Sequence, residues 1–424
     1  MARFKRNPQN SISRKIPTYA DMRILLAHNF YTLQGGEDAV FSNEKVLLQR
    51  HGHEVIEYVR YNNEIGNYGV PQYAGLAART LWNWTSYAEI KSLIQKHRPD
   101  IAHFHNIFPL ISPAAYDACV DSGVPVVQTL HNARLFCPQG GLYYRGQRCE
   151  ACLGKALPWS GILRACYRES HIQSGLVGIM NAAHWRRGTW TDKVNRYIVF
   201  TSYFRDKFIQ AGLPANKITI KPHGIDDPGL GHACGDYALY AGRLTAAKGL
   251  KVLLRAWEKT RGVPLKICGT GELEDEVLRV AAESDGKVQL LPQVPREEVL
   301  ELIKRAAFLV WPSWGETFGL VALEAFACGK PVIASGARPM SDLVENSCTG
   351  IHFQVGDPDD LARQLTWAWE HPEEMKRMGA AARKKYESCY SVETNYEALI
   401  GIYTEVIQGV IPKPIDKGEF CYPA

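Results

Sequence analysis

The stretch from Trp311 to Ser335, WPSWGETFGLVALEAFACGKPVIAS, decides the fold that the sequence predicts. It runs from the end of one apolar strand, through an apolar helix, into a second apolar strand. Near-continuous apolar strands that alternate with helices are typical of a parallel sheet covered on both faces. Glu324 lies between Leu323 and Ala325 in this helix, and a buried carboxylate is costly unless a partner hydrogen-bonds it. The stretch therefore predicts a parallel sheet and a polar partner for Glu324.

The same alternation continues outward in both directions. Strand signals recur in MRILLAHNF, DIAHFH, PVVQTLHN and RYIVFTS, and again in YALYAGRL, LKICGTG, VQLLPQV and AFLVWPS. Between the two series lies HGIDDPGLGHACGD, a linker-like segment rich in Gly and Asp. A chain of 424 residues exceeds what one hydrophobic core usually serves. We therefore predict an α/β protein with two Rossmann-like, doubly wound parallel-sheet domains that face each other across a cleft.

The predicted organisation has five parts. A basic tail that we expect to be disordered precedes an N-terminal domain, and a linker leads to a C-terminal domain, which is followed by an amphipathic helix and a second tail. The expected boundaries are residues 1–20, 21–222, 223–236, 237–392 and 393–424.

Composition indicates an ordinary folded protein, with 46% hydrophobic and 22% charged residues. There is no apolar run long enough for a membrane span and no signal-peptide pattern, so we expect a cytoplasmic protein. The net charge of +5 resides in the 1–20 tail, whose charged side chains are all basic. The balanced remainder argues against nucleic acid as a partner. The tail is interpreted as a solvated leader or as a weak peripheral contact with anionic lipid at the inner face of the membrane.

A pair of cations follows the first strand of the second series. Arg243 and Lys248 lie just after YALYA, in AGRLTAAKG, a loop that enters a helix. Open parallel sheets bind ligands beyond the carboxyl ends of their strands, which is where this loop would lie. Two cations there suit a diphosphate, because they neutralise its charge without a metal ion. Taken alone, the pair could also be ordinary surface charge.

The segment WGETFGLVALEAF offers a second anion site. Gly315 and Gly319 allow a tight turn, and a helix is expected to begin near Phe318, so that free backbone amides at its start would form a phosphate cradle. Glu316 precedes the helix, and Glu324 would lie about two turns further along its axis. A nucleotide along this helix would give Glu324 ribose hydroxyls as partners, whereas a buried Lys or Arg is the alternative. The cradle amides belong to Thr317, Phe318 and Gly319.

Together these motifs resemble one family of enzymes. The segments GRLTAAKG, GTGELED, GIHFQVGDPDDLA and the block from Val294 to Ser335 are similar to those of the family-4 retaining glycosyltransferases of the GT-B fold, also called glycosyl transferases group 1. The resemblance implies a hexosyltransferase that moves a sugar from a UDP- or GDP-sugar to a saccharide or lipid-linked saccharide with retention of configuration, in cell-surface polysaccharide or glycan biosynthesis. The C-terminal helix would cross back to the N-terminal domain.

The resemblance also implies roles for individual residues. The N-terminal domain would lie on the acceptor side and the C-terminal domain would bind the nucleotide sugar. Arg243 and Lys248 would hold the donor diphosphate, and Glu324 would bind the ribose. Glu316 would be catalytic and face the transferred sugar, with the cradle amides around it. The base pocket would be lined by Gly269, Gly271 and Val294.

Glycine and histidine residues follow strands of the first domain. Gly35 and Gly36 come after the first strand at a helix start, where backbone can approach a ligand, and they match the family's glycine loop near the diphosphate. His103 and His105 end one strand and His131 ends the next, which suggests a shared site. His103 is interpreted as structural and His105 as an acceptor-side residue. The resemblance implies that His131 is an active residue that orients the reacting sugar.

The expected chemistry needs no catalytic metal. Stabilising the negative charge that develops on the leaving diphosphate is the largest contribution available, and the cations and helix-start amides would supply it. Asp357 and Asp359 have the Asp-x-Asp spacing of metal-dependent transferases, but they open a helix and are interpreted as a cap. No carboxylate in the first domain is an obvious nucleophile. We favour front-side attack by the acceptor, whose proton passes to the departing phosphate.

Four cysteines cluster in an insertion, residues 137–166, directly after His131. A Cys-x-x-Cys pair with two flanking cysteines is the ligand set of a closed structural zinc site. An iron–sulfur cluster, free thiols and a disulfide are the alternatives. The insertion resembles that of a subgroup of the family with the same HN, CP and CxxC pattern. The cysteines are Cys137, Cys149, Cys152 and Cys166.

Other functions remain open at this point. A nucleotide-sugar epimerase of similar fold would need acid and base residues in the cleft but no acceptor loop. A zinc-containing, non-catalytic binding protein would not need the second-domain motifs. An aromatic window in the first domain is expected to pack in the core or to form an apolar patch for a lipid-linked acceptor or a membrane. The window contains Leu81, Trp82, Trp84 and Tyr87.

Overall fold

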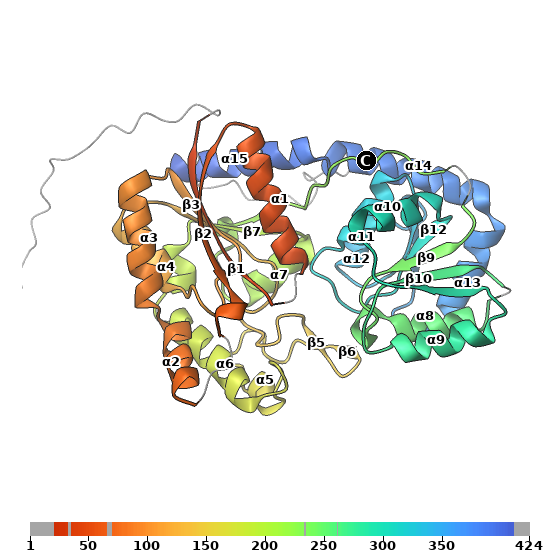
Figure 1. Cartoon of the computed structure of the whole chain (residues 1–424), viewed down its shortest axis with the longest axis horizontal. Coiled ribbons are helices and arrows are strands. Elements are labelled where there is room, and N and C mark those ends of the chain that lie inside the picture. The colour runs from red at the N-terminus through yellow and green to blue at the C-terminus, as the bar shows by residue number, and fades with distance from the viewer. Residues whose placement is uncertain (1–20, 33–34, 66–69, 233–234, 261, 411–424) are drawn as a thin grey trace, which may run out of the picture.

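The computed structural model describes residues 21–32, 35–65, 70–232, 235–260 and 262–410. The basic tail at 1–20 and the tail after residue 410 lie outside the described residues. Within the described part, two parallel sheets form two α/β domains that lie side by side (Figure 1). The predicted fold class is confirmed.

The first domain is built on a six-stranded sheet in the order β2-β1-β3-β4-β7-β8, in which every neighbouring pair is parallel. Side chains of a strand alternate between the two faces. Accordingly, Leu25 and Ala27 of β1 enter one core, while Ile24 enters the core on the other face. The strands are β1 (Arg23–Phe30), β2 (Glu54–Tyr61), β3 (Ile101–Phe104), β4 (Val126–Thr129), β7 (Arg196–Val199) and β8 (Ile218–Ile220).

Helices cover both faces of this sheet. Asn83 starts α3 by accepting hydrogen bonds from the amides of Thr85 and Ser86, and Thr201 caps α7 in the same way. Ile90 and Ile94 of α3 pack in the core on one face. The helices are α1 (Gly36–Arg50), α2 (Val70–Leu81), α3 (Trp84–His97), α4 (Ala114–Asp121), α6 (His171–Arg186) and α7 (Ser202–Gln210).

The second domain repeats this plan with a parallel sheet in the order β11-β10-β9-β12-β13-β14. Tyr240 and Val310 enter the core on one face, whereas Leu239 and Trp311 enter the core on the other. The strands are β9 (Ala238–Ala241), β10 (Leu265–Cys268), β11 (Val288–Leu291), β12 (Phe308–Trp311), β13 (Val332–Ser335) and β14 (Gly350–Phe353).

The helices of the second domain divide between these two faces. Side chains of α8, α9 and α13 pack on one face, and those of α10, α11 and α12 pack on the other. Asp357 caps α13 by accepting from the amides of Asp359 and Asp360, so the interpretation of this Asp-x-Asp pair as a helix cap is confirmed. The helices are α8 (Leu250–Trp257), α9 (Glu274–Glu283), α10 (Arg296–Arg305), α11 (Leu320–Ala327), α12 (Met340–Leu343) and α13 (Pro358–Glu370).

The last helix returns the chain to the first domain, as predicted. α14 (Pro372–Cys389) packs on the second domain, and α15 (Val392–Ile407) lies along the first (Figure 1). Leu399 and Tyr403 of α15 are fully buried in one core with Ile24, Ile101 and Val127. The last helix therefore covers a face of the first sheet that would otherwise be exposed. Every described helix is too short or too polar to span a lipid bilayer.

The strand order reverses between β1 and β3 in the first sheet and between β9 and β12 in the second. Ligands of open parallel sheets bind at such a reversal, beyond the carboxyl ends of the strands. These positions are occupied by the segments around His105, Arg243 and Glu316. The cysteine-rich insertion follows β4 and forms a hairpin, β5 (Tyr143–Tyr144) and β6 (Gln147–Arg148), and a short helix, α5 (Trp159–Leu163).

Candidate active site

Two helix starts meet where the domains face each other. A Cβ atom added at Gly36, the first residue of α1, would lie 3.9 Å from Cδ1 of Leu320, the first residue of α11. Free amides at helix starts attract anions, so their approach favours a phosphate site. The amide of Gly35 donates to Oδ2 of Asp38 at 2.9 Å. Of the two glycines in the predicted loop, Gly36 is therefore the better candidate to donate its amide to a ligand.

The turn before α11 requires glycine at position 319. Gly319 has φ +105°, and a Cβ atom there would lie 2.1 Å from the indole of Trp311. This conformation delays the helix, which begins at Leu320 and not near Phe318. The predicted spacing of two helical turns between Glu316 and Glu324 is therefore wrong, because the residues from Glu316 to Gly319 are not helical. Their amides still precede the helix start, as the cradle requires.

Lys248 and Glu316 form a close ion pair at this edge. Nζ of Lys248 lies 2.5 Å from Oε1 of Glu316, and the indole Nε1 of Trp311 donates to the same oxygen at 3.3 Å. Lys248 ends a short 3₁₀ turn after β9, and Gly249 packs this turn against the end of β12: a Cβ atom there would lie 1.9 Å from the carbonyl oxygen of Pro312. Two residues that were predicted to contact the donor thus lie together, although 68 positions separate them.

Glu324 is paired with an arginine. Only 8% of Glu324 is exposed, and Nε of Arg296, at the start of α10, donates to its Oε1 at 2.8 Å. Burial raises the pKa of Glu324, and Arg296 partly offsets this effect. Of the two partners considered for Glu324, the structure contains the basic side chain, whereas ribose binding stays a prediction. Both residues line an interdomain cavity of about 160 Å³ that also reaches Asn43 of α1.

The segments predicted to hold the base lie side by side. Gly269 and Gly271 have φ near +150°, and Cβ atoms there would lie 2.0 Å from the carbonyl oxygen of Gly242 and 2.6 Å from that of Leu244. The turn after β10 is thus packed against the backbone beside Arg243, which is exposed. Oγ1 of Thr270 donates to Gln293, next to Val294.

The three strand-end histidines have different surroundings. His103 is fully buried, with its ring nitrogens 2.7 Å from the hydroxyls of Thr129 and of Tyr403 in α15, which fits its interpretation as a structural residue. His105 Nδ1 lies 2.9 Å from His131 Nε2, which brings these two predicted residues into one site. His131 is 6% exposed and lines a cavity of about 60 Å³ together with Glu37, whose side chain bonds Asn132.

Several residues of this region were missed by the sequence analysis. Glu44 of α1 lies 3.1 Å from His105 Nε2 and 3.6 Å from Nζ of Lys221, and both are buried. A sequence signal for Glu44 does exist, because it occupies the apolar stripe of α1 between Phe41 and Leu48. Lys221 and Arg296 carry no such signal, since their role depends on which elements pack beside them.

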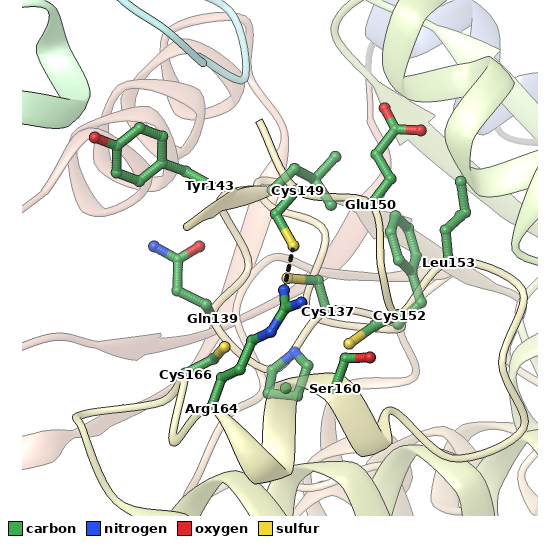
Figure 2. A pocket seen from close by; sticks show the side chains of 14 residues that line it. Cys137, Gln139, Tyr143, Cys149, Glu150, Cys152, Leu153, Ser160, Arg164 and Cys166 are labelled. Atoms are coloured by element: carbon green, nitrogen blue, oxygen red, sulfur yellow. Dashed lines mark hydrogen bonds between the residues drawn. The ribbon is translucent and has the colours of Figure 1, made fainter. Parts of the chain in front are cut away.

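The four cysteines of the insertion surround one small cavity of about 10 Å³ (Figure 2). Nη1 of Arg164 lies 3.4 Å from Sγ of Cys149. Burial, together with the neighbouring thiols, raises the pKa of Cys152 to about 11. Neighbouring thiols oppose each other's ionisation, whereas a bound cation would favour the ionised thiolate form.

The insertion also reaches the second domain. The guanidinium Nη2 of Arg148 in β6 donates to the carbonyl oxygen of Arg338 at 3.2 Å. A Cβ atom added at Gly315 would lie 3.6 Å from the carbonyl oxygen of Gly141. The insertion therefore contacts the loop that carries Glu316.

Comparison with known proteins agrees with this architecture. Residues 235–385 match the model of glycosyl transferases group 1, and residues 44–227 match that of Glycosyltransferase Family 4. The chain belongs to the GT-B glycosyltransferases. In this family, the group 1 domain of the chain contains Lys248, Glu316 and Glu324, and the Family 4 domain contains His105 and His131.

Relatives of this glycosyltransferase include two D-inositol 3-phosphate glycosyltransferases. That of Pseudarthrobacter chlorophenolicus is 34% identical over 273 residues, which is 61% of this chain and 60% of the relative. That of Streptomyces avermitilis is 33% identical over 185 residues, 40% of each chain. The matches thus span only about two fifths to three fifths of these relatives' length.

Solved structures share the fold at low sequence identity. Sucrose-phosphate synthase from Thermosynechococcus elongatus has a TM-score of 0.66 at 17% identity, over 92% of this chain and all of that chain. HepE from Anabaena, in complex with UDP and glucose, has a TM-score of 0.62 at 17% identity, over 91% of this chain and all of HepE. These likenesses support the two-domain GT-B fold of this glycosyltransferase.

Proposed function

We propose that this chain transfers a hexosyl group from a nucleoside diphosphate sugar to a saccharide or lipid-linked saccharide, with retention of configuration. The observation that carries the proposal is the meeting of Lys248 and Glu316 beside the start of α11, opposite the glycine loop of α1. A fixed cation and two helix starts suit a diphosphate, and a carboxylate suits sugar hydroxyls. The complex of HepE with UDP and glucose supports a UDP-sugar as donor, with GDP as the alternative.

In the proposed reaction, the bond between the anomeric carbon and the diphosphate oxygen breaks while a bond to the acceptor oxygen forms on the same face. The acceptor proton passes to the departing phosphate oxygen. Arg243, Lys248 and the amides before Leu320 stabilise the charge on that phosphate, which is where preorganised donors have their largest effect. His131 orients the transferred sugar, and no metal takes part in the chemistry.

The remaining predicted contacts complete the proposed donor site. Glu316 binds hydroxyls of the transferred sugar. Glu324 binds the ribose through its second carboxylate oxygen, because Arg296 hydrogen-bonds Oε1. The base lies between the glycine turn after β10 and the segment after β11, contacting Gly269, Gly271 and Val294.

We also propose that the cysteine insertion holds a structural zinc ion. Four thiols that line one small cavity form the donor set that zinc prefers, and the ion would offset the raised pKa values of Cys137, Cys152 and Cys166. In the described part of the chain, the one group with three ligand atoms within 4.8 Å of one another is Glu44, His103 and His105. Zinc binding at the cysteines therefore requires their sulfur atoms to draw closer together. The ion would hold the insertion against the second domain and so shape the acceptor side.

A nucleotide panel tests the proposed activity. With UDP, GDP or ADP at about 100 times its Kd, a nucleotide that binds only the folded state stabilises it by about 2.7 kcal/mol, so one of the three is expected to raise the thermal midpoint. The matching nucleotide sugar is then expected to yield a glycosylated acceptor. A changed nucleotide sugar without acceptor would indicate an epimerase. No thermal shift with any nucleotide would favour a non-catalytic binding protein.

Exposed apolar side chains favour binding of the protein to a lipid surface, where it would reach its acceptor. Ile172 and Ile179 lie on one side of α6 and are 85% and 54% exposed, and Leu163 of the adjoining α5 is 72% exposed. Of the aromatic window, Trp84 is 70% exposed. Exposed arginines of the same helices and their flanks, Arg164, Arg168, Arg186 and Arg187, would complement anionic headgroups.

Vesicle binding tests this membrane contact. We expect the protein to sediment with vesicles that contain phosphatidylglycerol, and the double variant Leu163→Asp/Ile172→Asp to bind at least about 10-fold more weakly, because each apolar side chain contributes about 1.5 to 3 kcal/mol when buried. Leu278→Asp, at an apolar residue of α9 that is 51% exposed, serves as the matched control and should bind normally. Equal binding by all three proteins would contradict the proposal.

A further inference from the structure

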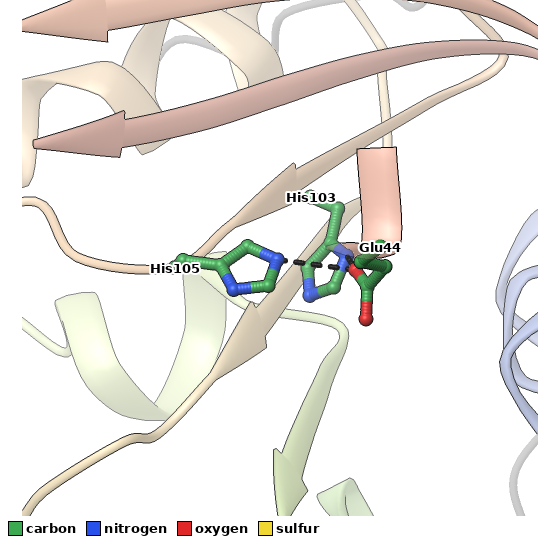
Figure 3. A group of neighbouring side chains, drawn as sticks. All are labelled: Glu44, His103 and His105. Atoms are coloured by element: carbon green, nitrogen blue, oxygen red, sulfur yellow. Dashed lines mark hydrogen bonds and ion pairs between the residues drawn. The ribbon is translucent and has the colours of Figure 1, made fainter. Parts of the chain in front are cut away.

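A buried chain of hydrogen bonds links α1 to the candidate sugar-orienting histidine. Glu44 Oε1 lies 3.1 Å from His105 Nε2, and His105 Nδ1 lies 2.9 Å from His131 Nε2. Figure 3 shows the side chains of Glu44, His103 and His105 gathered at one point. The three members of the chain, Glu44, His105 and His131, are each no more than 6% exposed. Water is therefore a poor competitor for these hydrogen bonds.

Glu44 is the fixed end of this chain because it is ionised. Burial opposes ionisation, yet the Lys221 ammonium and the hydrogen bond from His103 hold the pKa of Glu44 well below its usual range. Lys221 Nζ lies 3.6 Å from Oε2, and His103 Nδ1 lies 2.9 Å from Oε1. An ionised carboxylate only accepts hydrogen bonds. Any nitrogen bonded to it must therefore carry a proton.

The protonation of the two histidines follows in order. His105 Nε2 carries a proton, because Glu44 accepts from it. Burial lowers the pKa of His105 to about 4 and that of His131 well below its usual value, so both rings are neutral at pH 7 and carry one proton each. His105 Nδ1 is then bare and accepts from His131 Nε2. The single ring proton of His131 is therefore on Nε2, and its Nδ1 carries no proton.

We propose that Glu44 is a positioning residue that acts through His105 to fix His131 in the tautomer protonated at Nε2. His131 then offers a bare Nδ1, which accepts a hydrogen bond. This extends the proposed function: the transferred sugar must carry a hydroxyl that donates to His131, and a deoxy or O-methyl sugar at that position is discriminated against. Helix α15 also helps to hold Glu44 in place, because the hydroxyl of Tyr403 bonds His103, which contacts Glu44.

A metal ion bound by Glu44, His103 and His105 is the competing explanation, because their ligand atoms lie within 4.8 Å of one another. Three contacts argue against it. The Lys221 ammonium already neutralises the carboxylate, the Tyr403 hydroxyl lies 2.7 Å from His103 Nδ1, and the second nitrogen of His105 holds His131. Metal analysis of the protein therefore forms part of the test.

The tautomer can be read directly in the full-length protein. With ¹⁵N-labelled histidine, the signal of His131, assigned by its absence in His131→Gln, is expected to show protonation at Nε2 and a bare Nδ1. This measurement needs neither turnover nor a variant at position 44, so it stands even where the proposed function fails. Protonation of His131 at Nδ1 or at both nitrogens would overturn the proposal.

Kinetics test the consequence for the reaction. Gln can donate as well as accept, so Glu44→Gln is expected to shift the His131 signal toward Nδ1 protonation and to lower kcat about 10- to 100-fold, the size expected for one lost or reversed hydrogen bond. In a His131→Ala background, Glu44→Gln should have no further effect on kcat. An equal loss in both backgrounds would assign Glu44 a purely structural role. A metal ion that persists in the variant with all four insertion cysteines replaced by serine would support the competing explanation.

Discussion

Replacing Lys248 by alanine is expected to lower kcat/KM by about 10²- to 10³-fold, the effect of removing one preorganised group that stabilises developing charge. The ammonium now pairs with Glu316 at 2.5 Å, so its loss has two consequences. The donor diphosphate loses a counterion, and the largely buried Glu316 keeps only the Trp311 indole among its bonded partners in the described structure. An uncompensated carboxylate beside a diphosphate repels it.

Steady-state kinetics and nucleotide titration measure this effect. Lys251→Ala is the matched control, because Lys251 is in α8, three residues away, with half of its side chain exposed, and pairs with Glu276 at 3.9 Å. The control should retain normal kcat/KM. Lys248→Arg should recover part of the loss, since it restores charge with a different geometry. Normal nucleotide affinity and turnover in Lys248→Ala would remove the donor-site assignment.

Replacing Cys152 by serine is expected to release the zinc ion and to loosen the insertion. Cys152 is 7% exposed and lines the four-cysteine cavity. Structural zinc sites supply about 10 to 16 kcal/mol of binding energy in small zinc domains, so loss of one thiolate ligand should be visible as a lower thermal midpoint. Because the insertion contacts Arg338 and the loop of Glu316, kcat/KM should fall by up to about 10²-fold, the cost of misplacing reacting groups.

Elemental analysis of the purified protein, with thermal unfolding, checks this expectation. Cys348→Ser is the control, since Cys348 is an exposed free cysteine outside the insertion. It should keep the wild-type metal content and thermal midpoint. A wild-type protein that contains no zinc after purification in zinc-supplemented buffer, or a Cys152→Ser variant with unchanged zinc content, would rule the zinc site out.

The residues of the proposed donor side could be singled out from the sequence because they occur in short local motifs. Arg243 and Lys248 lie within one loop. Glu316 lies in a second motif, WGETFGLVALEAF, close to the start of a helix. The error in the start of α11 also has a local cause. Helical periodicity does not reveal the positive φ of Gly319, a position where the Trp311 ring leaves no room for a Cβ atom.

Fewer residues of the proposed acceptor side could be predicted from the sequence. Histidines at two strand ends indicated a shared site, but Glu44 and Lys221, which set the charge of that site, were not recognised. The partner of Glu324 could be narrowed to ribose or a basic side chain, and only the structure identified Arg296.

By itself, the sequence determined the two parallel sheets, the crossing helix and the glycine, lysine and glutamate positions at the strand ends. These follow from periodicity and from residue types within a few positions of one another, so each segment carries its own signal. Only the tertiary structure decided which ionisable groups meet: Glu44, His105, His131 and Lys221 come from four separate elements, and Tyr403 reaches His103 across 300 positions. Charge state, tautomer and partner depend on burial and on distances of a few ångströms, which arise when distant segments pack and leave no local trace in the chain.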